Sequence, residues 1–509
     1  MKFGFINKIL VGSCVCSLYS CTDLLDKYDP TKLNVETFYQ TEKELQQAAN
    51  GIYGNLQGYV GGVWQYTEMI TDNTTIHFNP TDRGQGPGLE AIEYWQIVST
   101  TMDQLNGPMN IYNVAYQHLV NINTVLKKID SSNLGEEIKN KVAGQMYFMR
   151  ALYYFDLVRF FCDVVIITEP ISTPDEAWTY ERSPISKVYE LIDSDISQAI
   201  KNLPMPDELL SSEIGLPTKG AALVLQGRTY LERHMYSEAI ASFKAVTTMG
   251  YELLDDYAKV FDPVFKNHKE SIMDVQFQGN NELGEQSGFL YNFYPRESYG
   301  AVIPFPGVSG GGWNIPTLDI INDYEEGDVR KDISLCEGYM SNDGNWVSVP
   351  YINKYNHAHS IQGVPDDNWP LMRYAEVLLS LAEAINELEG PTDEAYSYLN
   401  KIRERAHLAP VSGLSKEEFK KCVLHERRIE LAFENHRWFD LKRTNTPEEL
   451  AAFLNAYGKR EMTNPTTEER KKTAFAVGDF EFEPYEVYFP VPAREMRLNP
   501  NLKQTAGYK

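Results

Sequence analysis

The chain has 509 residues, of which 43% are hydrophobic and 23% are charged, and its net charge at pH 7 is −24. This length suffices for two or more domains or for one large helical array. The acidic balance argues against a nucleic-acid partner, because neutralising phosphates requires clustered Lys and Arg.

The first twenty residues have the layout of a secretory signal peptide, with Lys2 and Lys8 close to an apolar stretch from Ile9 to Leu18. That stretch is too short to span a bilayer. The following Tyr19-Ser20-Cys21 resembles the end of a bacterial lipobox, where a small residue precedes the cysteine that becomes acylated. We therefore predict a signal peptide over residues 1–20 and lipidation of Cys21. An ordinary signal peptide that happens to contain a cysteine is the alternative.

The rest of the chain offers no second membrane segment and no cysteine framework. No later stretch reaches the roughly 20 apolar residues that a membrane helix requires, so we expect a protein that is anchored and does not span. Cys162, Cys336 and Cys422 are widely separated and form no CxxC pair. A disulfide framework and a zinc knuckle are therefore both disfavoured.

Helical periodicity dominates after a polar tether over residues 21–41. It begins near Glu42, and apolar residues then recur at spacings of three and four, which predicts amphipathic helices. The strongest segments are 141–161, 186–203, 219–249, 371–406 and 415–443.

Internal repetition is visible within these helices. Gly227, Tyr230, Tyr236, Ala239 and Phe243 occur at the offsets of a tetratricopeptide helix pair. In such a pair, small residues let two antiparallel helices approach, while aromatic residues fill the groove between them. Part of the pattern recurs at Ala395, Leu399 and Ile402. Repeats of this kind bury their apolar faces by stacking on neighbours.

Two stretches lack this periodicity, residues 58–91 and residues 262–370. Gly, Pro, Asn and aromatic residues concentrate in the longer one, and a loop-rich region of this length inside a folded chain is usually functional. Its aromatic residues include Tyr291, Tyr294, Tyr299, Phe305, Trp313 and Trp346. Any one of them could pack beneath a surface loop, but as a set they favour a binding surface.

Distinctive strings follow one another along the chain in a recognisable order. The N-terminal half carries residues 144–163 and 218–222 (TKGAA), and the C-terminal half carries 369–379 (WPLMRYAEVLL), 400–406 (NKIRERA), 426–443 (ERRIELAFENHRWFDLKR) and 489–504 (FPVPAREMRLNPNLKQ). In content and order these strings resemble the SusD/RagB family of outer-membrane nutrient-binding lipoproteins. The resemblance covers nearly the whole mature chain.

The resemblance implies a mainly α-helical fold, with tetratricopeptide-like repeats and an irregular, loop-rich ligand-binding portion. It divides the mature chain into an N-terminal helical region over residues 42–261 and a C-terminal region over residues 262–509. Within the latter, 262–370 would be loop-rich, 371–443 helical and 444–509 a closing segment.

The function implied by the resemblance is binding without catalysis. The protein would be anchored in the outer membrane through lipid, facing the cell exterior, and would bind an oligo- or polysaccharide. It would deliver this ligand to a SusC-like TonB-dependent transporter, with no cofactor. Peptide uptake, as RagB-like members imply, is the alternative. A surface glycoside hydrolase is a third, because its two catalytic carboxylates are defined by their distance in the folded protein and leave no fixed spacing in the sequence.

The resemblance also places the ligand site on loops opposite the repeats. Sugar rings stack their C–H faces on Trp and Tyr, while sugar hydroxyls need Asp, Asn and Arg. The candidate ligand-binding residues are Trp64, Tyr66, Asp72, Asn73, Trp95, Tyr291, Tyr294, Arg296, Trp313 and Arg373. Core packing of Trp95 and an ion pair of Arg373 at a helix start stay open as alternatives.

Other motifs point to architecture and not to chemistry. Charges alternate in sign at helical-neighbour spacings, which predicts a helix and its exit turn held by ion pairs, at Arg427, Glu430, Glu434, Arg437, Asp440 and Arg443. Residues 307–311 fit the pattern of a nucleophile elbow, but prolines flank them where a strand and a helix are required. His357 and His359 could share one face of a strand, yet a lone HxH pair is weak evidence, and we predict no metal.

Overall fold

The computed structural model describes residues 39–80, 87–105, 110–171, 173–281 and 284–508. The predicted signal peptide, the predicted lipidation site Cys21 and all of the tether except residues 39–41 lie outside this part of the chain.

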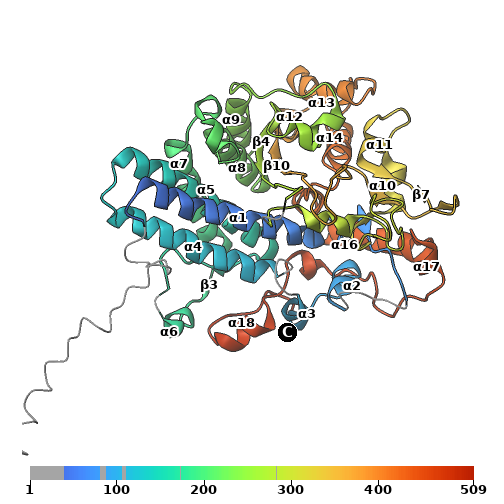
Figure 1. Ribbon diagram of the computed structural model, residues 1–509, viewed down its shortest axis with the longest axis horizontal. Helices are drawn as coiled ribbons and strands as arrows, with labels where there is room; N and C mark the ends of the chain where they lie inside the picture. Colours follow the sequence, from blue (N-terminus) through green and yellow to red (C-terminus); the bar gives the residue numbers. More distant parts are fainter. Residues whose placement is uncertain (1–38, 81–86, 106–109, 172, 282–283, 509) are drawn as a thin grey trace, which may run out of the picture.

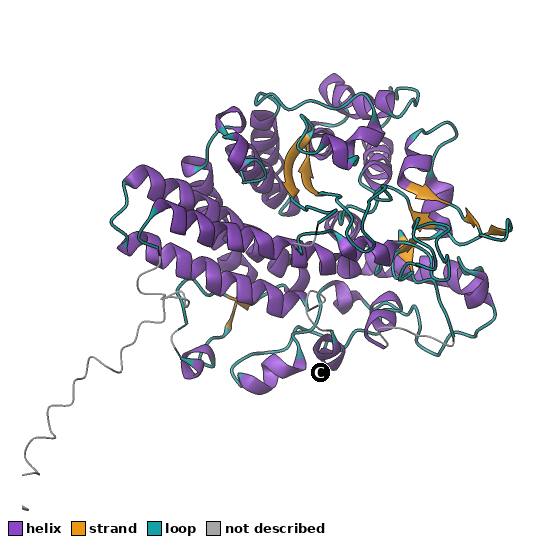
Figure 2. Ribbon diagram, in the orientation of Figure 1, coloured by secondary structure: helices purple, strands orange, loops and turns teal. Residues whose placement is uncertain are grey.

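Helices make up most of the described chain, as expected (Figure 2). The long ones are α1 (Glu42–Thr67), α4 (Ile111–Ser131), α5 (Glu136–Phe161), α7 (Ile185–Asn202), α8 (Lys219–Glu232), α9 (Tyr236–Val246), α12 (Tyr374–Glu389), α13 (Asp393–Arg405), α14 (Lys416–Glu430) and α16 (Pro447–Thr463). The short ones are α2 (Pro87–Glu93), α3 (Ser99–Gln104), α6 (Pro174–Ala177), α10 (Leu318–Asp323), α11 (Arg330–Ser334), α15 (Arg437–Thr444), α17 (Glu468–Lys471) and α18 (Ala493–Leu498). Each of the five strongest helical predictions is confirmed, with shifted ends.

The strands are short and form antiparallel pairs, two of which, β1 with β5 and β4 with β10, join segments that are far apart in sequence. The pairs are β1 (Thr74–Thr75) with β5 (Ile315–Pro316), β2 (Val164–Val165) with β3 (Arg182–Ser183), β4 (Ser271–Val275) with β10 (Trp369–Arg373), β6 (Leu335–Cys336) with β9 (Tyr351–Ile352), and β7 (Tyr339–Met340) with β8 (Trp346–Val347). Most of these strands lie between residues 262 and 370, where the sequence predicts loops, and they tie those loops together.

Helices that follow one another in sequence pack side by side, first α4, α5, α7, α8 and α9, with the short α6 apart from them, and then α12, α13 and α14 (Figure 1). The contact between α8 and α9 shows why small residues are needed there. A Cβ at Gly227 would lie 2.5 Å from the ring of Phe243 on α9, so the two helices approach through the missing side chain. This confirms the steric role predicted for Gly227 opposite an aromatic residue. The likeness of these pairs to tetratricopeptide units stays a prediction.

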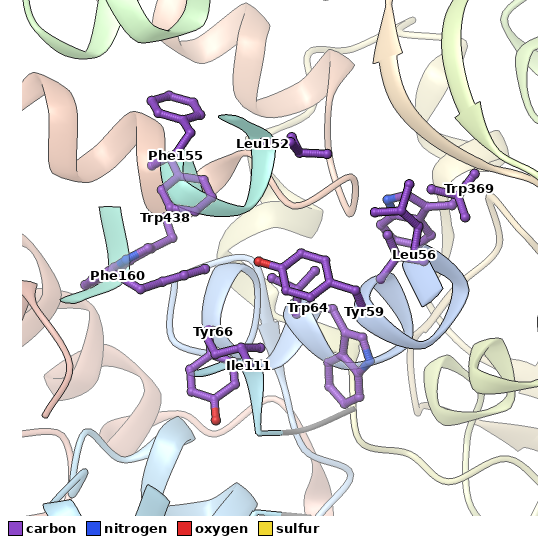
Figure 3. Close-up of a cluster of buried hydrophobic side chains, with 14 of the residues drawn as sticks. Leu56, Tyr59, Trp64, Tyr66, Ile111, Leu152, Phe155, Phe160, Trp369 and Trp438 are labelled. Carbon is purple, nitrogen blue, oxygen red and sulfur yellow. The ribbon is translucent and has the colours of Figure 1, made fainter. Parts of the chain in front are cut away.

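The core is rich in aromatic side chains from several elements (Figure 3). Tyr66 on α1 lies edge-on to Phe489 with ring centroids 5.2 Å apart, and Trp438 on α15 stacks on the same Phe489 at 6.1 Å. The C-terminal segment therefore closes the core formed by the N-terminal helices, although more than 400 residues separate Tyr66 from Phe489 in the sequence.

The prediction of an irregular stretch from residue 58 is wrong at its start, because α1 continues to Thr67. Glycines that suggest a break sit inside this helix. Gly61 lies beside the ring of Phe289, where a Cβ would make ordinary contact at 3.6 Å, so packing does not require a glycine there. The burial of Trp64 and Tyr66 in the same turns outweighs the poor helix propensity of glycine.

A cluster of charges is buried where β4, β10, α11, α13 and α14 meet. This buried ion cluster comprises Glu270, Arg330, Lys354, Arg373, Arg405, Glu430 and Glu434. Arg373 lies at its centre, with Nη1 2.6 Å from Glu430 Oε1 and 3.0 Å from Glu270 Oε1, and with Nε 2.6 Å from Glu434 Oε2. Each of these carboxylates is shared by at least two cations, which compensates part of their cost of desolvation.

The electrostatics of Glu430 show the balance within the cluster. Burial alone would raise the pKa of this carboxyl, but the guanidinium groups of Arg405, Arg373 and Arg330 hold the pKa well below its ordinary value. Glu430 therefore contributes stability at neutral pH, and this contribution is lost only as the pH falls below its unfolded-state pKa.

The architectural role predicted for residues 426–443 agrees with these contacts, but the sequence predicts ion pairs within one helix and its exit turn. The helix instead ends at Glu430 and a new one begins at Arg437, after a turn in which Phe433 and Asn435 have positive φ. Most partners are distant in sequence: Glu434 binds Arg373, Arg437 binds Asp72 and Arg443 binds Glu383.

Replacing Gly227 by Ala should destabilise the protein by about 1–3 kcal/mol, because the new methyl group would overlap the Phe243 ring. Gly51→Ala on α1 is the matched control, since a Cβ there meets no atom within 4 Å. It should stabilise by about 0.5–1 kcal/mol through helix propensity. Urea unfolding measures both, and equal effects of the two changes would contradict the tight approach of α8 and α9.

Arg373→Leu should cost about 3–5 kcal/mol, because it leaves Glu270, Glu430 and Glu434 buried beside too few cations. Lys187→Ala is the control, since it removes an exposed ion pair with Glu190 and should cost less than about 1 kcal/mol. Chemical denaturation distinguishes the two, and a small loss for Arg373→Leu would show that the cluster contributes little.

Candidate ligand-binding face

The pairing of β1 with β5 brings two loop regions together. Thr74 lies opposite Pro316 and Thr75 opposite Ile315, so the chain after β1 runs beside the chain before β5. The amide of His77 donates to the carbonyl oxygen of Gly312 at 2.7 Å and extends this contact. We call residues 76–79, 291–313 and 338–347 the loop face.

A run of glycines packs against the segment 291–296. The amide of Gly310 donates to the carbonyl of Pro295 and that of Gly312 to the carbonyl of Tyr294, both at 2.9 Å. A Cβ at Gly310 would overlap the carbonyl oxygen of Tyr294, so glycine is required by this close approach. Neighbouring Ser309 is flanked by neither strand nor helix, and its Oγ accepts the amide of Tyr299 at 2.9 Å. The resemblance to a nucleophile elbow therefore reflects backbone packing.

Arg296 and Trp313 form a stacked pair at the base of the loop face. The guanidinium carbon of Arg296 lies 4.2 Å from the centre of the Trp313 ring, and its Nε donates to the carbonyl of Gly311 at 2.8 Å. The amide of Arg296 donates to Nδ1 of His77 at 3.2 Å. Beside this pair, Nδ2 of Asn79 donates to Glu297 at 3.2 Å. Polar groups and an aromatic ring thus lie together on a fixed backbone.

The most exposed aromatic residues of the loop face are Tyr299 and Trp346, at 57% and 59% exposure. Trp346 lies on β8, in the hairpin that projects at the end of the molecule opposite α6 and α7 (Figure 1). A Cβ at Gly338 would be 2.6 Å from the indole, so the ring rests on the backbone and turns its remaining surface to solvent. Nδ2 of Asn342, at the hairpin turn, donates to the carbonyl of Tyr299 at 2.9 Å and joins the two parts.

A tyrosine–histidine contact borders the loop face. The hydroxyl of Tyr291 lies 2.7 Å from Nε2 of His359, and the amide of Gly363 donates to the same hydroxyl at 2.9 Å. His357 contacts Asp367 instead, with Nδ1 2.5 Å from Oδ1, and neither histidine lies on a strand. Within the described ranges, no group of three or more His, Cys, Asp or Glu side chains could hold a metal ion.

Comparison with known proteins identifies the family. A model of the SusD family matches residues 334–508, and a model described as starch-binding associating with outer membrane matches residues 23–231. SusD-like protein P2 of Formosa agariphila is 29% identical over 481 residues, covering 87% of this chain and 91% of its own. The chain belongs to the SusD/RagB family.

Solved structures of SusD-like proteins share the fold. A laminarin-binding SusD-like protein has a TM-score of 0.73 and 24% identity, covering 92% of this chain and 100% of its own. Surface glycan-binding protein A from Bacteroides uniformis has a TM-score of 0.73 and 20% identity with the same coverage. In the part of the chain that the structure describes, no helix is both long and apolar enough to cross a membrane.

Four aromatic residues proposed as ligand contacts of this SusD/RagB protein are core residues. Trp64 packs edge-on against Phe293, Tyr66 against Phe489, and Trp95 against Phe480, while Nε1 of Trp95 donates to the carbonyl of Ile70 at 2.9 Å. The hydroxyl of Tyr294 donates to the carbonyl of Tyr355 at 2.7 Å. All four are at least 97% buried and have no ring face for a sugar, so their assignment to the site is corrected. For Trp95 this is the alternative left open by the sequence.

Three polar candidates are engaged in buried ion pairs and hydrogen bonds. Arg428 and Arg437 each lie 2.8 Å from the Asp72 carboxylate, and they outweigh the effect of burial and lower its pKa. Asn73 donates to Glu68 at 3.1 Å and accepts from Arg428 at 3.0 Å. Arg373 belongs to the buried ion cluster. These residues hold the fold together. Of the three candidates that remain, Arg296 and Trp313 are themselves more than 90% buried and Tyr291 is half-buried, and their role in binding stays a prediction.

The exposed residues Tyr299 and Trp346 belong to the predicted aromatic-rich region but are not among the predicted site residues. A signal for Trp346 exists in the sequence, because Asn342-Asp343-Gly344 between Tyr339 and Trp346 is a strong hairpin turn. A short hairpin places alternate side chains in solvent. No comparable signal distinguishes Tyr299 from its buried neighbour Tyr294.

A buried acid supports the loop face from below. Glu93 Oε1 accepts the hydroxyl of Thr75 and, at 3.1 Å, the amide of Ile76, while its Oε2 has no partner among the described residues. Burial raises the pKa of Glu93 to about 7, with nearby Glu461 adding to the effect and both hydrogen bonds opposing it.

The raised pKa gives Glu93 a distinct pH dependence. Its contribution to stability is fully present below its unfolded-state pKa near 4.5 and is lost as the pH rises through about 7. In Glu93→Gln this loss should disappear, so the stability difference between wild type and variant should change by at least about 1 kcal/mol between pH 5 and pH 8. Urea unfolding across this range measures it, and parallel pH profiles would contradict a raised pKa.

Proposed function

We propose that this SusD/RagB protein binds a glycan on the loop face and does not transform it. The observation that carries the proposal is the indole of Trp346, which is 59% exposed and supported from below by the backbone at Gly338. A flat apolar ring of this kind suits the C–H face of a sugar ring. Because the indole is already held in place, little side-chain entropy is lost on binding.

Polar groups beside the platform suit the hydroxyls of a saccharide. Glu297 and Asn342 are exposed next to Tyr299, and Arg296 lies over Trp313 at the base of the face. Carboxylates accept hydrogen bonds, guanidinium groups donate them, and amides do both. Such a mixture suits sugar hydroxyls, which both donate and accept. Tyr291, Arg296 and Trp313 are proposed as the inner wall of this site.

The names of similar proteins support a saccharide as the ligand. One neighbour in fold is described as laminarin-binding and another as a surface glycan-binding protein, and one matching family model is described as starch-binding.

We also propose where the protein acts. Acylation of Cys21 would anchor it in the outer membrane, facing the cell exterior, and a SusC-like TonB-dependent transporter would receive the glycan. Many weak stacking and hydrogen-bond contacts give modest affinity, which allows release into a transporter. Binding and release require no covalent step.

Trp346→Ala should weaken binding of the cognate glycan at least about tenfold, equivalent to about 1.4 kcal/mol, because it removes the stacking platform. Trp178→Ala is the matched control: Trp178 is 43% exposed but follows α6, at the other end of the molecule (Figure 1). Isothermal titration against a polysaccharide panel measures both.

Equal affinity of wild type and Trp346→Ala for every glycan bound would contradict the loop face as the site. Release of shorter sugars from a polysaccharide by the pure protein would contradict binding without catalysis.

A further inference from the structure

A groove separate from the loop face lies between α1 and β4. Two adjoining hollows of about 500 Å³ and 510 Å³ share Ile214, Gly215, Met273 and Asp274 among their lining residues and are open to solvent. Residues 50–57 of α1 form one wall, residues 206–216 another, and β4 with its continuation to residue 278 the floor. We call this the amide groove, and its lining includes no residue of the loop face.

Within the described floor of the groove, Asp274 carries a buried carboxylate oxygen without a hydrogen-bond partner. It is 7% exposed, and the hydroxyl of Ser271 donates to its Oδ2 at 2.5 Å. Asp274 lines both hollows, and its buried Oδ1 has no hydrogen-bond partner among the described residues. Burial raises the pKa of this carboxyl to about 6, as expected for an acid that lacks a second donor. A donor group from a ligand that reached Asp274 would satisfy this oxygen.

The amide side chains around Asp274 are fixed before any ligand arrives. Nε2 of Gln276 donates to Asn267 Oδ1 at 2.8 Å, and Nδ2 of Asn267 donates back to Gln276 Oε1 at 2.9 Å. Nε2 of Gln57 donates to the carbonyl of Gln276 at 2.8 Å and links α1 to the floor. Gly215, with φ +95°, lets its loop lie against the Gln276 side chain, since a Cβ there would be 2.5 Å away. The groove is therefore preorganised, which reduces the entropic cost of binding.

The charges along the groove disfavour an anionic ligand. Lys266 is neutralised by Asp366 at 2.8 Å and Lys269 by Glu252 at 2.9 Å. Asp274 and the lining acids Asp207 and Glu285 add negative charge. A suitable ligand must donate hydrogen bonds to acids and also exchange them with amides.

We infer that the amide groove is a second saccharide-binding site, which takes a neutral, hydroxyl-rich segment of a glycan with one hydroxyl donating to Oδ1 of Asp274. The ligand class rests on the proposed function, but the site is separate from the loop face. Each sugar hydroxyl both donates and accepts, so it matches acids and amides alike. A peptide backbone also donates and accepts, so peptides enter the test below as the competing ligand.

Gly54 provides a test that spares the fold. It lies on the groove wall in α1, and a Cβ there meets no atom within 4 Å, so Gly54→Trp should fill the groove without a clash in the core. Gly51→Trp is the matched control, because Gly51 is equally open on the same helix but does not line the groove. Asp274→Asn tests the carboxylate itself while keeping its shape.

The measurement is calorimetric titration of the full mature chain with short neutral gluco-, manno-, galacto- and xylo-oligosaccharides. Binding that survives in Trp346→Ala should weaken at least about tenfold when Gly54→Trp or Asp274→Asn is added, and should be unchanged with Gly51→Trp. Thermal unfolding of each variant confirms that it is folded.

Loss of all binding in Trp346→Ala alone would overturn the second site and leave the loop face as the only one. Binding that survives Trp346→Ala but is unaffected by Gly54→Trp and Asp274→Asn would also overturn it. If wild type binds peptides in the groove and none of these sugars, the saccharide assignment is overturned. If no ligand of either kind binds, the proposed function fails as well.

Discussion

The contacts of Arg373 with Glu270, Glu430 and Glu434 are the constraint on which the rest of the architecture depends. They join the end of β10, the start of β4 and the turn after α14, three segments that are far apart in sequence. A buried charge tolerates few alternative partners, so this cluster specifies one arrangement of those segments more sharply than apolar packing alone would. Helix α15 follows this turn and begins with Arg437, whose pairing with Asp72 ties the same region to the end of α1 and the approach to β1.

Through β1 this network reaches the surface where ligand binding is proposed. Asp72 and Asn73 immediately precede β1, and β1 in turn holds the segment before β5. The loops that display Tyr299 and Trp313 are thus fixed by strand pairing on one side and by buried ions on the other. This explains how a region with so little regular structure keeps defined positions: its order comes from the helical core beneath it.

The sequence predicted the helices well and the site poorly, and one physical reason accounts for both. Helical periodicity is a local property, so α5, α7 and α8 could be located from apolar spacing alone. Whether an aromatic ring is buried depends on residues distant in sequence: Trp64 is covered by Phe293, and Tyr66 by Phe489. Asp72 could not be distinguished from a ligand contact without knowledge of Arg428 and Arg437. Trp346 alone had a local signal, the turn of its own hairpin.

The nesting of that hairpin has a consequence for how such proteins diversify. β7 and β8 are enclosed between β6 and β9, which pair with each other and close the base of the excursion. Tyr339 and Val349 at its base are buried in the core, so changes in the length or sequence of residues 340–348 between them would leave the helical scaffold untouched. Selection could exchange this short segment as a cassette, altering which polymer is recognised while the remainder of the molecule stays constant.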